Sequence, residues 1–383
     1  MITFNGVTKK FPDGTIGVDN LDLHIEEGSF TVFVGPSGCG KTTSMRMINR
    51  MIDPSSGTLT VQGRDVTTMP RVQLRLRVGY VIQNAGLMPH RTVVDNVATV
   101  PMLRGESRHK ARMKALEAMD RVGLDLRMAT RYPAQLSGGQ QQRVGVARAL
   151  AADPPILLMD EPFSAVDPVV REDLQKEMRR LQSELAKTIV FVTHDIDEAV
   201  HLGDKVAVFG VGGVLQQYAD PKTLLSRPAT PFVTALVGRD RGYRSLSFRS
   251  SATVPIEMID VVTLEKPVEG PIGEEEWKLV VDEKGSPIGW LDRHGQQLVR
   301  AGSRPADVVI AVGSTTTEKA TLRQALDSAL SSPSGLGVVI DDRGRVAGVV
   351  KADAVIQRLA AIRREEAERT RAADLALSPR KGS

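Results

Sequence analysis

Cysteine is almost missing from this sequence of 383 residues, and long apolar runs are missing altogether. Cys39 is the only cysteine, so no disulfide forms within one chain, as is usual in a reducing compartment. No stretch reaches the roughly 18 consecutive apolar residues that a membrane-spanning helix needs. The first residues, MITFNGVTKKF, alternate as a strand does and contain no signal-peptide core. We therefore expect a cytosolic protein that does not itself cross a membrane.

An excess of one charge sign is also lacking. Lys and Arg total 50 and Asp and Glu total 46, which gives a net charge of +4 and a pI near 9.2. A balance this mild is compatible with nucleic acid or an anionic membrane surface, but it is more typical of an ordinary solvated surface. Hydrophobic residues make up 41% of the chain, as in other globular proteins. The length leaves room for roughly two or three domains.

The sequence does contain a glycine-rich loop between an expected strand and an expected helix. Residues 35–42, GPSGCGKT, satisfy the pattern G-x-x-x-x-G-K-[ST]. The backbone N–H groups of such a loop point at phosphate oxygens, and the helix that follows adds partial positive charge. Lys41 is expected to reach the β- and γ-phosphates of ATP, and the Thr42 hydroxyl to ligate Mg²⁺. The predicted nucleotide-binding set in this loop is Gly35, Pro36, Ser37, Gly38, Cys39, Gly40, Lys41, Thr42 and Thr43.

Two further polar clusters follow apolar strands. In ILLMDEP, Asp160 and Glu161 come after four apolar residues. Asp160 is expected to hold Mg²⁺, commonly through water, and Glu161 to activate the attacking water as a general base. In FVTHD, His194 is placed to sense the charge of the γ-phosphate. Strands that alternate with helices and end in polar clusters predict an α/β core of mostly parallel strands up to about residue 235.

A second phosphate-binding turn, Ser137-Gly138-Gly139-Gln140, opens another expected helix. One ATP needs one phosphate cradle, so this turn would be redundant within one subunit. It becomes useful when it faces a nucleotide held by another subunit, where its backbone N–H groups and the Ser137 hydroxyl would close on the γ-phosphate. The sequence therefore predicts a head-to-tail homodimer with two ATP molecules between the subunits.

These motifs, in this order, resemble the ATP-binding subunits of ABC transporters: GPSGCGKTT, LSGGQ, ILLMDEP, SAVD and FVTHD. The resemblance covers about residues 2–235. It implies a P-loop NTPase core, taken as domain 1–235, with a helical subdomain at about 88–150. It also implies three roles. Gln83 would take part in catalysis by contacting Mg²⁺, Asp167 would lie at the dimer seam, and Phe11 would stack on adenine, where the family more often has tyrosine.

The stretches QNAGLMPHRTVVDNVATVPML and FSAVDPVVREDLQ resemble the osmoprotectant branch, whose bacterial members import glycine betaine, choline, carnitine or proline. This resemblance implies ATP and Mg²⁺ as cofactors, separate membrane permease subunits as partners, and an extracytoplasmic substrate-binding protein as an indirect partner. It implies a peripheral place on the cytoplasmic face of the cell membrane, and no nucleic acid.

The ATP-binding subunit does not touch the transported solute, so two alternatives stay open. One is an importer of another small solute, such as an amino acid or a sulfonate. The other is a non-transport ABC ATPase that acts on DNA or ribosomes. Such proteins usually have two cassettes or a DNA-repair insertion, and this chain has one cassette and neither feature.

Beyond an expected linker at 236–252, the sequence repeats itself. LVVDEKGSPIGW (279–290) aligns without gaps with VVIDDRGRVAGV (338–349), and each unit predicts a hairpin with an Asp/Gly turn. The two units resemble paired cystathionine-β-synthase-type (CBS) modules in a small α+β domain at 253–360, the first degenerate because it has no clear leading helix. A charged C-terminal tail occupies 361–383.

The repeats lack the residues that grip ribose in CBS modules that bind adenine nucleotides. Those modules have Ser/Thr three residues, and Asp six residues, after the hairpin glycine. Here the positions hold Lys351 and Ala354 in one module and Asp292 and Gly295 in the other. This favours dimerisation, or sensing of ionic strength or another ligand, over AMP or ATP sensing, with a cyclic dinucleotide as an alternative. The C-terminal helix is expected to be solvated or to pack in a dimer, with membrane sensing as the alternative.

The single cysteine lies inside the phosphate loop, at the N-terminus of the following helix. A helix N-terminus lowers the pKa of a thiol, so we expect Cys39 to have a lowered pKa. For its native role we expect only that a small residue is tolerated there. A maleimide on Cys39 should nevertheless block ATP.

Overall fold

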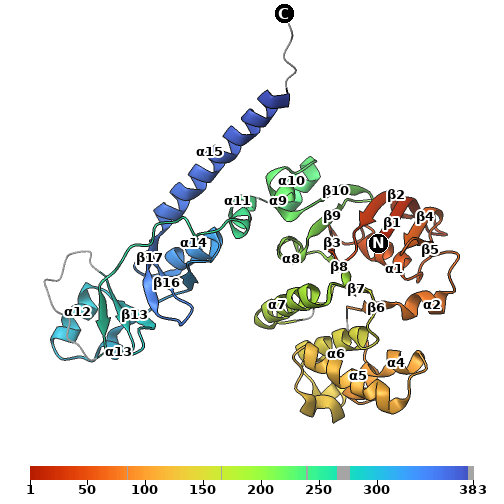
Figure 1. Cartoon of the computed structure of the whole chain (residues 1–383), viewed down its shortest axis with the longest axis horizontal. Helices are drawn as coiled ribbons and strands as arrows, with labels where there is room; N and C mark the ends of the chain where they lie inside the picture. The colour runs from red at the N-terminus through yellow and green to blue at the C-terminus, as the bar shows by residue number, and fades with distance from the viewer. Residues whose placement is uncertain (84, 165, 239, 265–276, 378–383) are drawn as a thin grey trace, which may run out of the picture. The chain divides into compact units, whose positions relative to one another are not determined.

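The computed structural model describes residues 1–383 except 84, 165, 239, 265–276 and 378–383. The chain divides into two compact units, Met1–Arg239 and Asp240–Ser383, and each has its own hydrophobic cores (Figure 1). Within the described residues, no helix combines the length and the apolar character that crossing a membrane requires.

Two sheets build the first unit. The larger has the order β10-β9-β3-β8-β7-β6, in which only β10 runs antiparallel to its neighbour. Its strands are β3 (Phe30–Val34), β6 (Val78–Val81), β7 (Ile156–Asp160), β8 (Thr188–Thr193), β9 (Lys205–Phe209) and β10 (Leu215–Ala219). The smaller sheet is antiparallel, with the order β2-β1-β4-β5. Its strands are β1 (Ile2–Lys10), β2 (Ile16–Ile25), β4 (Ser56–Val61) and β5 (Arg64–Asp65).

The central strands are buried because both faces of their sheet are covered. FTVFV, ILLMD and TIVFVT are buried at every position in β3, β7 and β8, as continuous apolar runs in parallel sheets usually are. Successive side chains of a strand point to opposite faces. Accordingly, Phe30, Val32 and Val34 join the core shared with the helices, while Phe33 joins the core between the two sheets.

Ten α-helices and two short 3-10 helices complete the described part of the first unit. The α-helices are α1 (Lys41–Ile48), α2 (Arg71–Leu76), α3 (Val93–Val97), α4 (Thr99–Leu103), α5 (Arg108–Arg121), α6 (Gly138–Leu150), α7 (Pro168–Leu185), α8 (Ile196–Leu202), α9 (Pro221–Ser226) and α10 (Pro231–Val237), and the 3-10 helices are η1 (Leu126–Thr130) and η2 (Pro133–Gln135). Helices α4, α5 and α6 gather in a lobe below the sheet (orange and yellow in Figure 1). The predicted fold class, a P-loop α/β core with a helical subdomain, is confirmed.

The second unit contains the sequence repeat as a repeat of strand order. In each module a first strand pairs in parallel with the second, and the second pairs antiparallel with the third, with a register shift near the turn of the hairpin. The strands are β11 (Val261–Thr263), β12 (Lys278–Val281) and β13 (Pro287–Leu291) in one module, and β15 (Thr315–Thr317), β16 (Leu336–Ile340) and β17 (Val346–Lys351) in the other. The leading helix that the first module was expected to lack would fall at 265–276, outside the described residues.

The two hairpin turns are alike in their hydrogen bonds. Asp282 Oδ1 accepts from the N–H groups of Lys284 and Ser286 at 2.9 and 2.7 Å. Asp341 Oδ1 accepts in the same way from Arg343 and Arg345, at 2.8 and 2.9 Å. The modules also share one core, formed by Leu279, Val281, Trp290, Val312, Val338 and Val349.

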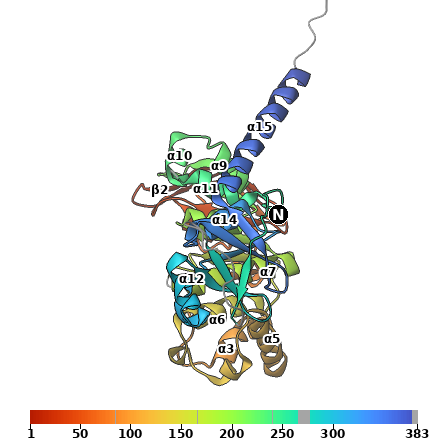
Figure 2. The same cartoon turned by 90° about the vertical axis from the view of Figure 1, so that its left-hand side faces the viewer.

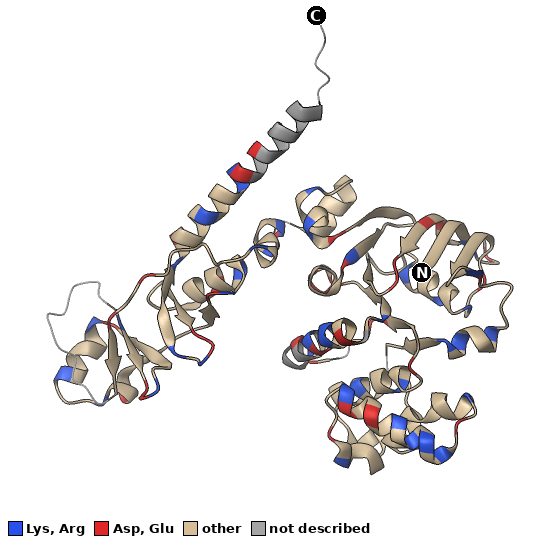
Figure 3. Cartoon of the chain, viewed as in Figure 1, with Lys and Arg blue, Asp and Glu red and all other residues tan. Residues whose placement is uncertain are grey.

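The remaining elements of the second unit are α11 (Arg241–Ser245), η3 (Leu246–Phe248), α12 (Arg293–Arg300), α13 (Pro305–Val308), β14 (Ile310–Ala311), α14 (Leu322–Ser331) and α15 (Ala352–Leu377). The segment expected as a linker, 236–252, thus carries α11 and η3. Leu246 is buried and packs in one core with Leu322 and Val355, so this part of the segment belongs to the second unit. Helix α15 extends away from the strands of its own unit (Figure 2) and carries both charge signs (Figure 3).

Candidate functional site

Four polar segments of the first unit follow parallel strands of one sheet. The glycine-rich loop follows β3, Gln83 follows β6, Asp160 ends β7 with Glu161 directly after it, and His194 follows β8. Because β3, β6, β7 and β8 run in parallel, their carboxyl ends meet at the same edge, where open α/β sheets bind ligands.

The glycine-rich loop packs so closely on its neighbours that two positions admit only glycine. Gly40 has φ +91°, and a Cβ there would lie 2.2 Å from the Gly17 carbonyl oxygen. Gly35 has φ +152°, and a Cβ there would lie 2.3 Å from the Phe209 carbonyl oxygen. Glycine has no Cβ and tolerates positive φ, so the loop wraps tightly before α1 begins.

The ammonium of Lys41 is held inside this loop. Lys41 Nζ donates to the carbonyl oxygens of Gly35 and Pro36 at 2.7 and 2.8 Å, and it lies 3.7 Å from Cys39 Sγ. The side chain is buried. A positive charge is therefore fixed where the loop's N–H groups are suited to receive phosphate.

The expectation of a lowered pKa for Cys39 is wrong. The thiol is buried, and this burial raises its pKa, although nearby Lys41 acts in the opposite direction. Desolvation disfavours the thiolate. The sequence shows the helix N-terminus but not the burial, which depends on how the loop packs.

Thr42, in the first turn of α1, and Asp160, at the end of β7, are brought together. Thr42 Oγ1 donates to Asp160 Oδ1 at 2.8 Å. Tyr80 Oη donates to Asp160 Oδ2 at 3.4 Å, and an Arg46 guanidinium nitrogen lies 3.5 Å from the same oxygen. Sequence reasoning missed Tyr80 and Arg46. The spacing of Arg46, four residues after Thr42 on α1, was a usable signal, because residues i and i+4 share a helix face.

These oxygens suit Mg²⁺. Mg²⁺ is usually held by one or two carboxylates together with substrate phosphates, not by a cage made of protein alone. Asp160 offers one carboxylate, and the Thr42 hydroxyl beside it offers a further oxygen ligand. Among the described residues, no group of three or more His, Cys, Asp or Glu side chains gathers into a separate metal site.

Glu161 and His194 form a pair beside this carboxylate. His194 Nδ1 lies 3.3 Å from Glu161 Oε2. Glu161 has φ +44°, which is uncommon for a residue other than glycine and is found where surrounding structure enforces it. The enforcing contacts are Glu161 N donating to the Val192 carbonyl at 3.0 Å and Ser164 Oγ donating to the Glu161 carbonyl at 3.0 Å.

A small pocket of about 40 Å³ opens beside the pair, and a cavity of this size has room for one water molecule. Glu161 and His194 both line it. The arrangement thus places a carboxylate and an imidazole around a space the size of one water.

Phe11 is partly buried, and Gly17 lies between it and the phosphate loop. A Cβ at Gly17 would lie 2.6 Å from Phe11 Cε2, and the Gly17 carbonyl packs on Gly40. Gln83 is exposed in the turn after β6, and β6 is the neighbour of β7. The structure therefore places Phe11 beside the loop, and it places Gln83 one strand away from Asp160.

The second turn is built as a helix cap. Gln140 N donates to Ser137 Oγ at 3.3 Å, and Ser137 N donates to Gln140 Oε1 at 3.0 Å, which is a capping box. Ser137 and Gly138 are exposed. Helix α6 lies in the helical lobe, while α1 lies at the sheet (Figure 1). In a single chain this turn therefore lies at the surface. Asp167, also exposed, directly precedes α7.

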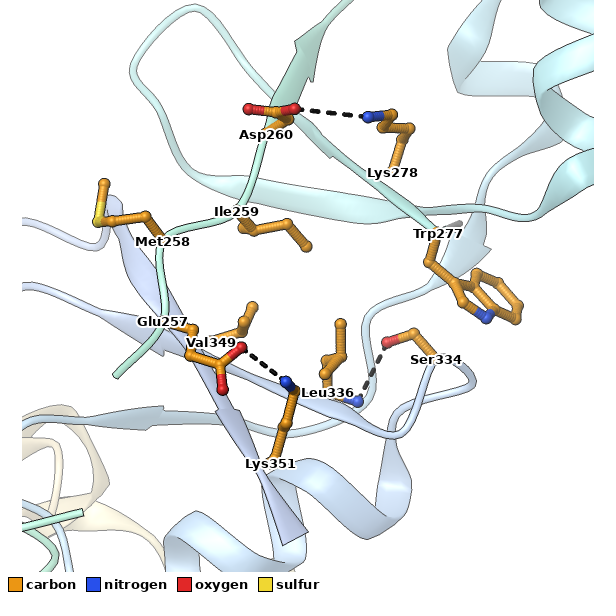
Figure 4. A pocket seen from close by; sticks show the side chains of 10 residues that line it. All are labelled: Glu257, Met258, Ile259, Asp260, Trp277, Lys278, Ser334, Leu336, Val349 and Lys351. Atoms are coloured by element: carbon orange, nitrogen blue, oxygen red, sulfur yellow. Dashed lines mark hydrogen bonds and ion pairs between the residues drawn. The ribbon is translucent and has the colours of Figure 1, made fainter. Parts of the chain in front are cut away.

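The second unit has a pocket of about 490 Å³ along the β16–β17 hairpin (Figure 4). Two ion pairs lie at its wall. Lys351 Nζ lies 2.7 Å from Glu257 Oε2, and Lys278 Nζ lies 3.6 Å from Asp260 Oδ2. The other lining residues are Met258, Ile259, Trp277, Ser334, Leu336 and Val349.

Comparisons with known proteins agree with this site. A family model described as ABC transporter matches residues 18–164. The osmoprotectant import ATP-binding protein OsmV of Salmonella typhimurium is 39% identical over 378 residues, which is 96% of this chain and 98% of OsmV. The glycine betaine/carnitine/choline transport ATP-binding protein OpuCA of Bacillus subtilis is 38% identical, over 91% of this chain and 94% of OpuCA.

A solved structure shows the same fold in the first unit. The ATP-binding cassette MJ0796, a dimer in a post-hydrolysis state bound to ADP and Pi, is 33% identical with a TM-score of 0.54. The match covers 58% of this chain and 99% of that one. With phosphate loop, carboxylates and histidine at one sheet edge, and with OsmV matched almost end to end, this chain belongs to the ATP-binding subunits of ABC transporters and is an ABC-type ATPase that binds ATP.

Proposed function

We propose that this chain energises an importer of compatible solutes, namely quaternary amines such as glycine betaine, choline and carnitine, or proline. The observation that carries the proposal is the similarity to OsmV and OpuCA, which covers more than nine-tenths of each of the three chains and therefore includes the second unit. Both relatives are named for transport of such solutes. The site at the sheet edge would hydrolyse the ATP that drives such transport.

The geometry supports a division of roles within one site. Lys41 binds the β- and γ-phosphates, and Phe11 stacks on the adenine. Glu161 accepts a proton from the attacking water, and His194, 3.3 Å away, holds that carboxylate and contacts the γ-phosphate. Mg²⁺, held by Thr42, Asp160 and Gln83, would neutralise charge on the phosphates when bound.

A second copy of the chain completes each site. Its Ser137, Gly138, Gly139 and Gln140 would close on the γ-phosphate, with Asp167 at the seam. The surface position of this turn in one chain supports the arrangement, and the similar cassette MJ0796 was solved as a dimer. The N–H groups and the dipole of α6 would then face the phosphate.

The proposed partners follow from the importer. Integral permease subunits would bind this ATPase at the cytoplasmic face of a bacterial membrane, and an extracytoplasmic substrate-binding protein would act on it indirectly. No nucleic acid takes part.

Transport by the assembled complex tests this function. The chain is isolated with its permease, placed in vesicles, and supplied with ATP and labelled glycine betaine, choline, carnitine or proline. We expect uptake of at least one of them, and none with Lys41→Ala. Uptake restricted to an amino acid or a sulfonate would contradict the solute class, and isolation with ribosomes or DNA instead of a permease would contradict transport itself.

For the second unit, we propose paired CBS-like modules that serve dimerisation or ionic-strength sensing. The residues at two positions where ribose-binding modules have Ser or Thr make contacts inside this unit instead. Lys351 pairs with Glu257, and Asp292 Oδ1 caps α12 by accepting from Gly295 N at 2.7 Å. We expect no micromolar binding of AMP or ATP to residues 241–383 in calorimetry. Such binding would instead make this unit an energy sensor.

A shortened chain tests whether the second unit regulates hydrolysis. Residues 1–240 contain both cores of the first unit and every predicted site residue. We expect this piece to hydrolyse ATP while the salt dependence of the full chain disappears. An unchanged salt response in the shortened chain would remove ionic-strength sensing from the second unit.

A further inference from the structure

Glu198 is a buried carboxylate to which the roles above give no part. It lies in the first turn of α8 and is 6% exposed. Burial raises its carboxyl pKa, and Thr193 acts in the opposite direction through a hydrogen bond. Because an unpaired buried carboxylate is costly, the contacts of Glu198 are informative.

One oxygen of Glu198 holds the turn that carries His194. Thr193 Oγ1 donates to Glu198 Oε2 at 2.6 Å, and the same hydroxyl accepts from Asp195 N at 3.0 Å. The residues on both sides of His194 are thus joined through the Thr193 hydroxyl, which Glu198 holds. The His194 side chain itself is 61% exposed, so its direction depends on this turn more than on packing around the ring.

The other oxygen faces α7. Gln175 Nε2 donates to Glu198 Oε1 at 3.4 Å, and Arg171 Nε lies 4.0 Å from it. Arg171 Nε is buried and has no hydrogen-bond partner within the described residues, and Glu198 Oε1 places a negative charge beside it. Arg171 Nη2 also donates to the Val166 carbonyl at 3.3 Å.

These contacts form a continuous path from the segment before α7 to the histidine turn. The path runs from the Val166 carbonyl through Arg171 and Glu198 to Thr193, and Val166 is the neighbour of Asp167. We propose that Glu198 is a positioning residue for ATP hydrolysis, which fixes the His194 turn relative to the Asp167 turn. The proposal rests on the proposed role of His194.

Steady-state hydrolysis by the full-length chain tests the proposal. We expect Glu198→Ala to lower kcat by about ten- to a hundredfold, because a small displacement of a catalytic group has an effect of this size. The Kd for ATP should stay within about twofold of the wild-type value, because the phosphate loop that binds ATP is untouched. Glu198→Gln keeps an acceptor for Thr193 and should restore most of the rate.

The double variant with His194→Ala separates positioning from a general loss of structure. If Glu198 acts through His194, Glu198→Ala should have no further effect on kcat in the His194→Ala background. Thr193→Val should lower kcat like Glu198→Ala and should not add to it. The proposal would be overturned if the fold-losses in kcat multiplied when Glu198→Ala is combined with His194→Ala or with Thr193→Val. It would also be overturned if Glu198→Ala alone left kcat unchanged.

Glu172 on α7 provides the matched control. Its side chain is 69% exposed and pairs with Lys176, so Glu172→Ala should leave kcat unchanged. If Glu198→Ala unfolds at a clearly lower temperature, the Glu198→Gln and Thr193→Val variants decide the outcome. Wild-type turnover by His194→Ala would refute the proposed role of His194. Losses that multiply in the double variant would instead refute only the proposal that Glu198 acts through His194.

Discussion

The two units use the polar residues at the ends of their strands in opposite ways. In the first unit, four parallel strands end at one edge, and side chains at or after the ends of different strands meet there, as Thr42 with Asp160 and Glu161 with His194. In the second unit, the equivalent side chains are bound within the fold: Asp282 and Asp341 close their own hairpin turns.

The difference lies in topology. A polar side chain after a strand becomes part of a shared site only where several parallel strands end side by side. Each module of the second unit has one parallel pair and one hairpin. In each module only two parallel strands end side by side, and the polar residue after the second of them, Asp282 or Asp341, stabilises its own hairpin turn. If this contrast holds, substitutions at the sheet edge of the first unit should impair hydrolysis far more than substitutions at the strand ends of the second unit.

Removing the proposed base should have the largest effect. Glu161→Gln should lower kcat by roughly 10²-fold or more while ATP still binds, because an amide cannot accept the proton of the attacking water. The ATP-bound dimer should accumulate. Phosphate release measures the rate, and size-exclusion chromatography with ATP measures the dimer. Near wild-type turnover would remove Glu161 from the role of base.

Blocking the exposed turn should stop hydrolysis without preventing ATP binding. Ser137→Arg or Gly138→Asp places bulk or negative charge where the γ-phosphate of the other subunit is expected. Mixing Ser137→Arg with Lys41→Ala should restore activity that neither variant has alone, because one of the two sites is then intact. Loss of ATP binding in the monomeric Ser137→Arg variant would show that the two loops act within one chain.

Labelling of Cys39 should show a smaller effect, set by burial. Its raised pKa means that less thiolate is present at pH 7.5 than in a free cysteine, and the thiolate is the reacting form. We expect slow maleimide labelling that accelerates as the pH rises toward the pKa of the folded state. Bound MgATP should slow it further. Mass spectrometry measures the rate, and labelling faster than that of free cysteine would contradict the burial of the thiol.

The smallest effect is expected at the ion pair of the second unit. Lys351 and Glu257 are each about half exposed, and an exposed pair contributes about 0–1 kcal/mol. Lys351→Ala should shift the salt concentration at half-maximal hydrolysis slightly and leave the KM for ATP unchanged, since screening acts over about 8–10 Å. The control is Lys319→Ala, whose pair with Asp342 is almost entirely exposed. Equal shifts in both variants would assign the response to net charge instead of this pair.

Much of the catalytic edge was predictable because its signals are local. The phosphate loop is one contiguous pattern, and β7 and β8 are continuous apolar runs, so the fold class could be predicted and is confirmed. The roles of the site residues stay predictions. The repeat in the second unit was equally visible, because Asp282 and Asp341 occupy the same place in two similar turns.

By itself the sequence determined which residues stand in the loops, since turn chemistry and the period of apolar residues depend on neighbours along the chain. Only the tertiary structure decided which loops meet and what burial does to them. It placed Tyr80 and Arg46 against Asp160, joined Glu198 to the turn of His194, and raised the pKa of Cys39 where the local pattern predicted the reverse. Desolvation and contacts between distant residues arise from packing, and packing is a property of the whole fold.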